Sequence, residues 1–577
     1  WISSVTDKAI RQGFSKLRPG KEFENLYASA VARSEADWVV GINATRALTC
    51  KYNAQLSCGR VQTPTLAIIA QKEEEIRNFK SRKFYGVNAT ADKIRFTWQD
   101  SKSKDTKTFD KDHCDQLIKK ISNQEAKIID VTKTHKKKYS PQLYDLTELQ
   151  RDANRIFNYS AKETLAIMQR LYENHKVLTY PRTDSRYISA DIIETLPERI
   201  RACQIGPYSR IATKLLKESI KGNRRFVDDE KVSDHHAIIP TEESPDLRSL
   251  SDKERKIYDL VVKRFLAVLY PAFEYEQTII TADIANETFI AKGRRIIKQG
   301  WKEVYENQFE DEEEMIEDQR LPKVEKGDIF NSLKIRQTTG KTNPPAPFNE
   351  GTLLTAMEHP ARYMENKDKE LVRTIGETGG LGTVATRADI IEKLFNSYLI
   401  EKRGKDIWIT SKGKQLLELV PEELKSPTLT AQWEQKLNAI AQGKLNKDVF
   451  IEEMKEYSKE VVREIKESTE KFKHDNITTT RCPKCNQFML SVNGKRGKML
   501  VCQDRECGER QTVSITTNSR CPNCYKRLEL RGQGEGQIFV CVCGHRERLS
   551  AFNARKKKQN NRPSKKEIAK YMNKQRK

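Results

Sequence analysis

The chain has 577 residues, too many for a single hydrophobic core, and so predicts several domains. Lysine and arginine number 105 against 81 acidic residues, and the resulting net charge of +24 favours a polyanionic partner, of which nucleic acid is the commonest. No apolar run approaches the ~18 residues of a membrane-spanning helix and no signal peptide is visible, which disfavours the membrane and secreted classes.

Residues 1–74 carry helical patterning, and the block Gly59–Leu66 opens its last helix. Within that block, Arg60 and Gln62 could donate hydrogen bonds to phosphates or base edges. The spacing alone favours a simpler interpretation, a surface arginine followed by a helix N-cap at Thr63.

Strand-like patterning covers residues 84–134 and returns at 272–290 and 323–339. A mostly helical segment, 140–266, lies between the two β-rich blocks. This order is expected when one domain is inserted into another, so we predict a β-rich domain whose halves bracket a helical domain.

The start of the helical segment predicts a helix-turn-helix. Asp145 and Ser160 fit helix N-caps, and each is followed three residues later by a glutamate that can reach back to the cap. Apolar residues at helical spacing follow both caps, and only about three residues, 157–159, separate the helices.

The segment Leu178–Tyr187 follows the second helix. β-Forming residues predict a short strand that ends at Tyr180, and Pro181 favours an extended backbone. A period of two then places Tyr180 and Arg182 on one face, where a phenol could attack a phosphate held by a guanidinium. Tyr180 is one of nineteen tyrosines, and a packed strand residue is the simpler interpretation of this segment alone. Its position as the wing-side strand of a DNA-binding winged helix favours the functional one.

The second half of the chain is expected to be largely helical. We expect the acidic run 304–320 to form a mobile loop without chemistry. The glycine loop Gly379–Thr383 precedes a helix and suits a phosphate at the helix N-terminus. Amphipathic helices are predicted at 389–395, 413–419, 429–442 and 449–466.

Eight cysteines near the C-terminus form two quartets with an offset of 39 residues. The quartets are Cys482, Cys485, Cys502 and Cys507, then Cys521, Cys524, Cys541 and Cys543. Paired cysteines without a secretory signal predict two tetrahedral Zn²⁺ sites rather than disulfides. In the second quartet the fourth ligand is open between a cysteine and His545.

Side chains suited to stacking and phosphate contact accompany both quartets: Phe488, Lys495, Arg496, Tyr525 and Phe539. The tail 553–577 has eleven lysines or arginines and one glutamate, and we expect it to be disordered and to attract phosphates.

Six blocks of this sequence closely resemble the motifs of type IA DNA topoisomerases. The blocks are Gly59–Leu66, Pro141–Gln150, Ser160–Ala161, Leu178–Ser185, Asp234–Thr241 and Gly380–Ala388. The Tyr-Pro-Arg sequence at 180–182 is most similar to bacterial enzymes of the topoisomerase III type. The resemblance covers residues 1 to about 475.

The resemblance implies a multidomain α+β fold with a toroidal core and two C-terminal zinc ribbons. The expected domains are a helical DNA-groove domain (1–74 and 343–475), a β-rich hinge domain (75–139 and 267–342), a winged-helix catalytic tyrosine domain (140–266), zinc ribbons at 476–514 and 515–552, and the basic tail 553–577.

The resemblance also implies an ATP-independent enzyme that cleaves, passes and rejoins single DNA strands through a 5′-phosphotyrosine, relaxing negative supercoils or decatenating DNA. Tyr180 would be the nucleophile, Arg182 would neutralise the scissile phosphate and His235 would lie beside them, with His236 as the alternative histidine. The implied DNA-binding residues are Arg60, Gln62, Thr386 and Arg387.

In this family Mg²⁺ binds an acidic cluster in an N-terminal Toprim domain. The acidic runs 228–230 and 311–314 have different spacing, and the chain begins at Trp1, so we expect the Mg²⁺ site to lie outside this sequence and these residues alone to be inactive. The alternative is a non-catalytic fragment that binds single-stranded nucleic acid. A tyrosine recombinase is disfavoured. In that class the histidine precedes the tyrosine, whereas here Tyr180 precedes His235 and His236.

The expected partners are single-stranded and duplex DNA, with a helicase as a protein partner. We expect a monomer that associates with the nucleoid in the cytoplasm and not with a membrane.

Overall fold

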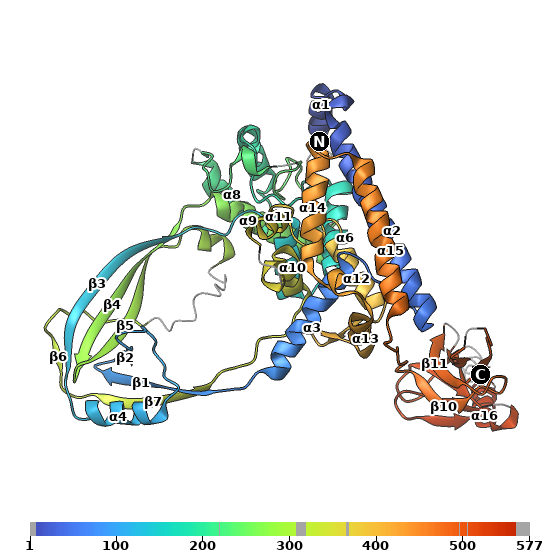
Figure 1. Ribbon diagram of the computed structural model, residues 1–577. Helices are drawn as coiled ribbons and strands as arrows, with labels where there is room; N and C mark the ends of the chain where they lie inside the picture. The colour runs from blue at the N-terminus through green and yellow to red at the C-terminus, as the bar shows by residue number, and fades with distance from the viewer. Residues whose placement is uncertain are drawn as a thin grey trace, which may run out of the picture. The chain divides into compact units, whose positions relative to one another are not determined.

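The computed structural model describes residues 7–218, 220–232, 234–306, 319–364, 368–494, 497–504, 506–532 and 534–560 (Figure 1). The chain divides into two compact units, Trp1–Ile42 with Cys58–Glu460, and Asn43–Ser57 with Val461–Lys577. Across the described ranges, every helix is too short or too polar to cross a membrane.

The helices up to Leu269 are α1 (Asp7–Ser15), α2 (Glu24–Tyr52), α3 (Gln62–Asn78), α4 (Lys111–Ile121), α5 (Leu146–Phe157), α6 (Ala161–Glu173), α7 (Leu196–Ala202), α8 (Ser209–Leu216) and α9 (Asp252–Leu269). The later helices are α10 (Glu350–Glu358), α11 (Lys369–Glu377), α12 (Arg387–Asn396), α13 (Ser411–Leu419), α14 (Pro427–Ala441), α15 (Lys447–Glu467) and α16 (Leu549–Asn560).

The strands of the first unit are β1 (Lys83–Ala91), β2 (Ile94–Trp98), β3 (Ala126–Lys138), β4 (Phe273–Ile284), β5 (Glu287–Lys298), β6 (Ile329–Phe330), β7 (Lys334–Lys341), β8 (Ile400–Arg403) and β9 (Asp406–Ile409). Those of the second unit are β10 (Ile477–Arg481), β11 (Phe488–Gly494), β12 (Gly497–Cys502), β13 (Arg510–Thr512), β14 (Ser514–Arg520), β15 (Arg527–Arg531), β16 (Ile538–Val540) and β17 (Arg546–Arg548).

The two predicted β-rich blocks form one sheet. Its order is β6-β3-β4-β5-β2-β1-β7, so strands from before and after the helical segment are hydrogen-bonded neighbours. β3 pairs with β4 along most of its length, and β4 joins β5 through Ala285 and Asn286, both at positive φ as a tight hairpin requires. The sheet therefore has the arrangement that an inserted domain predicts.

Helix α4 lies within a stretch that the sequence predicted to be strands only. Asp110 caps it by accepting a hydrogen bond from the backbone N–H of His113. Its buried residues Cys114, Leu117 and Ile121 share a core with the sheet, and Figure 1 shows the helix beside β1 and β7. The Asp110 cap, together with apolar residues at helical spacing, was the signal that could have identified this helix.

The predicted helix-turn-helix is present as α5 and α6, which pack together across a short turn. Asp145 and Ser160 accept hydrogen bonds from the third backbone N–H of their helices, as predicted. The reciprocal half of each cap is absent from these two described helices. Glu148 instead pairs with Arg151, and Glu163 with a lysine of α9, because both glutamates have a cation within reach.

The segment predicted to be the catalytic domain, residues 140–266, has a hydrophobic core built from α5, α6, α9 and the segments around them. It includes Leu149, Leu171, Leu178, Ile239 and Phe265. The chain of the Tyr180 segment thus starts inside the core, where its backbone is fixed by packing.

The four helices predicted after residue 388 are confirmed within a few residues by α12 to α15. A hairpin, β8–β9, lies between two of them and was not predicted; Gly404, at φ 68°, makes its turn. Of the predicted acidic loop 304–320, the first residues complete a 3₁₀ helix, Gly300–Tyr305, and residues 307–318 lie outside the described ranges.

The second unit contains two small antiparallel sheets that repeat one pattern. β10 to β13 form the first and β14 to β17 the second, each with four strands in sequence order. Helix α16 packs on the second sheet, where Phe552 contacts Phe539 at 4.4 Å between ring centroids. The expected disordered tail therefore does not start at 553, because residues up to 560 continue this helix; 561–577 lie outside the described ranges.

Candidate active site

The backbone that carries Tyr180 runs antiparallel to residues 239–241. The N–H of Thr179 donates to the carbonyl of Ile239 at 3.0 Å, and the N–H of Ile239 donates to Oγ1 of Thr179 at 2.9 Å. Leu178 and Pro240 form an isolated bridge rather than a longer ladder, because the N–H of Val177 bonds to Leu171 and that of Ile239 to the side chain of Thr179. This pairing brings the segment around His235 to Tyr180.

Burial alternates along the segment that follows Tyr180. Pro181, Thr183 and Ser185 are buried, whereas Arg182 and Asp184 are exposed. Oγ1 of Thr183 donates to the carbonyl of His235 at 2.9 Å, which fixes the buried face. The alternation agrees with the prediction that Tyr180 and Arg182 share a face.

Two aromatic rings contact the ring of Tyr180. The ring of His235 lies 4.2 Å away between centroids at an interplanar angle of 33°. The ring of Tyr172, from the last turn of α6, lies at 5.4 Å and 81°, which is an edge-to-face contact. The sequence analysis missed Tyr172, because helical spacing does not distinguish it from an ordinary core residue.

The two adjacent histidines have different surroundings. His236 is buried, its Nδ1 lies 2.7 Å from the carbonyl oxygen of Ala237, and burial lowers its pKa to about 4. His235 is partly exposed, and partial burial lowers its pKa below the usual value. The ring of His235 is the one that contacts Tyr180.

Arg182 is exposed and, among the residues that the structure describes, has no acidic partner. Arg186, four residues later, is paired with an acid, because its Nε donates a hydrogen bond to Oδ2 of Asp145 at 2.6 Å. Because Asp145 also caps α5, this pair ties the end of the tyrosine segment to the helix-turn-helix. Burial raises the pKa of Asp145 to about 6, against the opposing effect of Arg186.

Arg60 and Gln62 are both buried. The Arg60 guanidinium donates to Asp37 at 2.8 and 3.0 Å and to Glu434 at 3.0 Å, and lies 5.1 Å from the ring of Trp433. The simpler interpretation, a surface arginine and a Thr63 cap, is wrong on both counts. Arg60 is buried, and Thr63 lies inside α3, which starts at Gln62. Direct DNA contact by Arg60 and Gln62 stays a prediction. In this structure the guanidinium of Arg60 forms ion pairs with Asp37 and Glu434.

The other two predicted DNA-binding residues lie at the glycine loop. Thr386 is exposed and its Oγ1 accepts from the N–H of Thr383 at 3.0 Å. Arg387 has a side chain only 2% exposed; it donates to Oγ1 of Thr147 at 2.9 Å and to the carbonyl of Gly379. Arg387 thus ties the loop to the start of α5, and its contact with DNA also stays a prediction.

The loop itself needs its glycines. Gly379, Gly380 and Gly382 have φ of 81°, 83° and 73°, a region that favours glycine. A Cβ on Gly380 would collide with the carbonyl oxygen of Met357. The loop is therefore held closely against the end of α10.

The residues near Tyr180 do not form a magnesium site. Within the described ranges, only the two cysteine quartets bring three or more ligand atoms of His, Cys, Asp or Glu within 4.8 Å of one another. The carboxylates around Tyr180 are spread out or paired with arginine, so these residues do not fit the ion.

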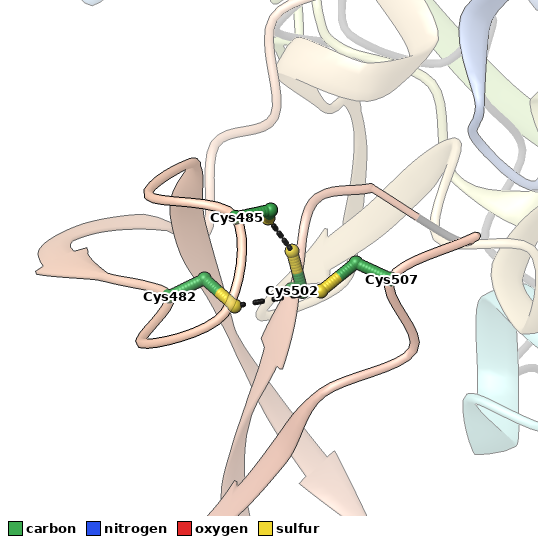
Figure 2. A group of neighbouring side chains, drawn as sticks. All are labelled: Cys482, Cys485, Cys502 and Cys507. Carbon is green, nitrogen blue, oxygen red and sulfur yellow. Dashed lines mark hydrogen bonds between the residues drawn. The ribbon is translucent and has the colours of Figure 1, made fainter.

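The first cysteine quartet converges from two loops of the first small sheet (Figure 2). The Sγ atoms of Cys482 and Cys507 are 3.6 Å apart, and those of Cys485 and Cys502 are 3.3 Å apart. Sulfurs around a tetrahedral zinc, with Zn–S of about 2.3 Å, are about 3.8 Å apart, so the quartet fits this ion with a small expansion. Burial opposes ionisation, but backbone N–H groups lower the pKa of Cys482 to about 7.

The second quartet repeats this geometry. Cys521 and Cys543 are 3.6 Å apart, and Cys524 and Cys541 are 3.3 Å apart. The cluster contains Cys543 and not His545, whose Nε2 lies 3.7 Å from a carboxylate oxygen of Glu547. The open choice of fourth ligand therefore falls on the cysteine.

The predicted stacking side chains differ in exposure. Tyr525 is 78% exposed, whereas Phe488 is 36% exposed and lies 4.2 Å from the guanidinium of Arg481. Phe539 is buried in the core with Phe552 and is not available to stack on a base, which corrects that prediction. Lys495 and Arg496 lie outside the described residues.

Comparisons with known proteins identify the family of this chain. A family model described as DNA topoisomerase matches residues 21–452. DNA topoisomerase 3 of Bacillus cereus is 63% identical over 581 residues, and that of Bacillus subtilis strain 168 is 61% identical over 578; each match covers 100% of this chain and 80% of the relative.

A solved structure of full-length topoisomerase I from Thermotoga maritima has a similar fold. The TM-score is 0.61, the identity is 24%, and the match covers 89% of this chain and 81% of that one. The matches extend over the motifs around Tyr180 and the glycine loop. The chain belongs to the DNA topoisomerase family, as a type IA enzyme of the topoisomerase III kind.

Proposed function

We propose that this protein cuts and rejoins one DNA strand through Tyr180 and passes another strand through the gap. The observation that carries the proposal is the position of Tyr180. Its ring packs against His235, and the alternating burial of this segment places Tyr180 and Arg182 on the same face. A phenol two residues from an exposed guanidinium on the same face could attack a phosphodiester that the guanidinium holds.

The proposed reaction conserves the phosphodiester energy. The phenol oxygen of Tyr180 attacks phosphorus, the bond from phosphorus to the 3′-oxygen breaks, and the tyrosine keeps the 5′-phosphate. The phenol proton is lost and the 3′-oxygen gains a proton, which leaves a free 3′-hydroxyl. Attack by that hydroxyl reverses every step, so resealing needs no ATP. Relaxation of negative supercoils or decatenation would follow from strand passage.

The chain's own residues would supply position and charge. Arg182 would offset the charge that builds on the phosphate, where a correctly placed donor is typically worth about 10²–10³ in rate. His235 would hold the ring of Tyr180, and Arg182 would be the positive group at the phosphate. Thr386 and the glycine loop, with Arg60, Gln62 and Arg387 behind them, would guide the strand.

No step of the proposed reaction uses Mg²⁺, because the described residues near Tyr180 do not fit the ion. We propose that the acids which bind magnesium are not among these residues, and that Zn²⁺ occupies both cysteine quartets. The proposed partners are single-stranded and duplex DNA, with a helicase as protein partner, for a monomer acting at the nucleoid.

The central test replaces Tyr180 with phenylalanine in the full-length protein. Tyr180→Phe should abolish covalent protein–DNA adducts on a single-stranded oligonucleotide while its affinity for the same oligonucleotide stays within about two-fold, because the phosphate contacts that dominate affinity are kept. Tyr187→Phe is a matched control, since Tyr187 also lies on this segment but bonds to Gln142. Adducts formed by Tyr180→Phe would show that another residue is the nucleophile.

A plasmid-relaxation gel on residues 1–577 alone, with Mg²⁺, tests the proposal that the magnesium-binding acids are not among these residues. We expect salt-sensitive binding to single-stranded DNA without relaxation, because a metal contributes to cleavage and, among the described residues, no metal-binding cluster lies beside Tyr180. Relaxation would contradict the assignment of magnesium elsewhere. Binding without adducts in the full-length protein would favour a non-catalytic strand-binding role.

A further inference from the structure

We propose that Tyr172 is a positioning residue for the nucleophile: its ring holds the ring of Tyr180 in the orientation from which the phenol attacks phosphate. The inference rests on the proposed function, because it takes Tyr180 as the nucleophile. It adds a residue that neither the sequence motifs nor the comparisons single out.

The first observation is the ring contact itself. Tyr172 meets Tyr180 edge-to-face, with centroids 5.4 Å apart and planes at 81°. This is a preferred geometry for aromatic pairs, because the positive edge of one ring meets the negative face of the other. The ring of His235 also contacts Tyr180, at 4.2 Å between centroids. The Tyr180 side chain is therefore restricted by two separate segments, the end of α6 and the segment at residue 235.

The second observation is where Tyr172 is buried. It is only 8% exposed, and its ring lies against the ring of Tyr180. The contact between Tyr172 and the proposed nucleophile is therefore shielded from solvent.

The third observation is the short, hydrogen-bonded connection between the two tyrosines. After α6 the chain reverses, with Lys176 at φ 57°, and the N–H of Val177 donates to the carbonyl of Leu171 at 3.0 Å. Thr179, the residue before Tyr180, then exchanges hydrogen bonds with Ile239. Hydrogen bonds therefore hold the chain on the way from Tyr172 to Tyr180, which favours a fixed contact between the two rings.

The electrostatics agree with a neutral Tyr172. Burial, and then the nearby phenol of Tyr180, raise the pKa of Tyr172. When Tyr180 ionises to attack, Tyr172 stays uncharged and continues to hold it through its ring. The ring rather than the hydroxyl is thus the part that matters.

The test compares two substitutions in the full-length protein. Tyr172→Leu keeps apolar volume and removes the ring, whereas Tyr172→Phe keeps the ring and removes the hydroxyl. Single-turnover adduct formation on an oligonucleotide should fall roughly 10- to 100-fold for Tyr172→Leu, since small misplacement of a reacting group costs about this much. Its dissociation constant for the oligonucleotide should stay within about two-fold, and Tyr172→Phe should cleave at close to the wild-type rate.

Tyr208→Leu is the matched control. Tyr208 is also buried in the catalytic domain and makes a T-shaped contact, 6.3 Å from Tyr258, but it does not contact Tyr180. It should destabilise the domain and leave the adduct rate unchanged. An equal loss of rate in Tyr208→Leu would show general destabilisation and overturn the inference.

Three further outcomes would overturn it: a wild-type rate for Tyr172→Leu, an equal loss for Tyr172→Phe, or a loss of affinity that matches the loss of rate. The Tyr180→Phe variant separates the two proposals. If it still forms adducts, the proposed function fails; if it does not and Tyr172→Leu is silent, only the positioning role fails.

Discussion

The catalytic domain and the two cysteine ribbons are stabilised in different ways. The catalytic domain buries a large set of apolar side chains from α5, α6, α9 and the segments between them. Among the described residues of the first ribbon, the buried cluster contains Cys482, Met489 and Cys502, and two of these three are ligands of the proposed zinc site. Segments of this size cannot offset the conformational entropy of folding by burial alone.

This difference indicates what fixes the backbone in each region. In the catalytic domain, packing fixes a backbone that then presents Tyr180 at the surface. In the ribbons, the chemistry of the cysteines would fix the backbone, and the exposed side chains such as Tyr525 follow from it. The predictions below separate these two sources of order.

Removing metal should have the largest effect. Purified protein should contain close to two zinc ions per chain, and chelation should unfold 477–548 while the catalytic domain keeps its melting transition. Structural zinc contributes about 10–16 kcal/mol to folding of such sites at pH 7. Elemental analysis and hydrogen exchange of the ribbon peptides measure both parts. One zinc per chain would implicate the irregular second quartet, and none would exclude the ribbons as zinc sites.

Removing core volume should have a smaller effect, confined to its own region. Leu149→Ala, in the core of α5, should cost about 2–5 kcal/mol of catalytic-domain stability through lost burial and a cavity. Leu528→Ala is the matched change in the second ribbon and should cost less while zinc is bound. Urea titrations read by pulse hydrogen exchange give both values. Equal losses would mean that the ribbon depends on its core as much as the catalytic domain does.

A change of pH should have the smallest effect. The pKa of Asp145 is raised to about 6 from an ordinary 3.8, so the folded state binds this proton more tightly than the unfolded state. Protonation of Asp145 therefore stabilises the fold as the pH falls, and this contribution is lost as the pH rises through 6. Between pH 7 and pH 5 it amounts to about 1 kcal/mol.

Asp145→Asn isolates that contribution, because asparagine can still cap α5 but cannot ionise. The difference in stability between wild type and Asp145→Asn should shift toward the wild type by this amount at pH 5, as read from urea midpoints of the α5 peptides. A difference that does not change with pH would show that Arg186 keeps the carboxylate ionised in this range.

The sequence by itself determined the features that depend on neighbours along the chain. The caps at Asp145 and Ser160, the alternation that places Tyr180 with Arg182, the helices after 388 and the repeated quartets all arise from spacings of a few residues. Such spacings act through backbone geometry, which is the same wherever the segment lies in the fold.

Only the tertiary structure decided features that join distant residues. His235 rather than His236 faces the tyrosine because residues 177–179 pair with 239–241, and Tyr172 reaches Tyr180 only when the chain reverses after α6. Arg60 and Arg387 look like free cations in the sequence, and are buried because Glu434 and Thr147 come to them from far along the chain. Long-range contacts depend on how whole elements pack, and local patterns carry no information about which distant partner an exposed-looking side chain will meet.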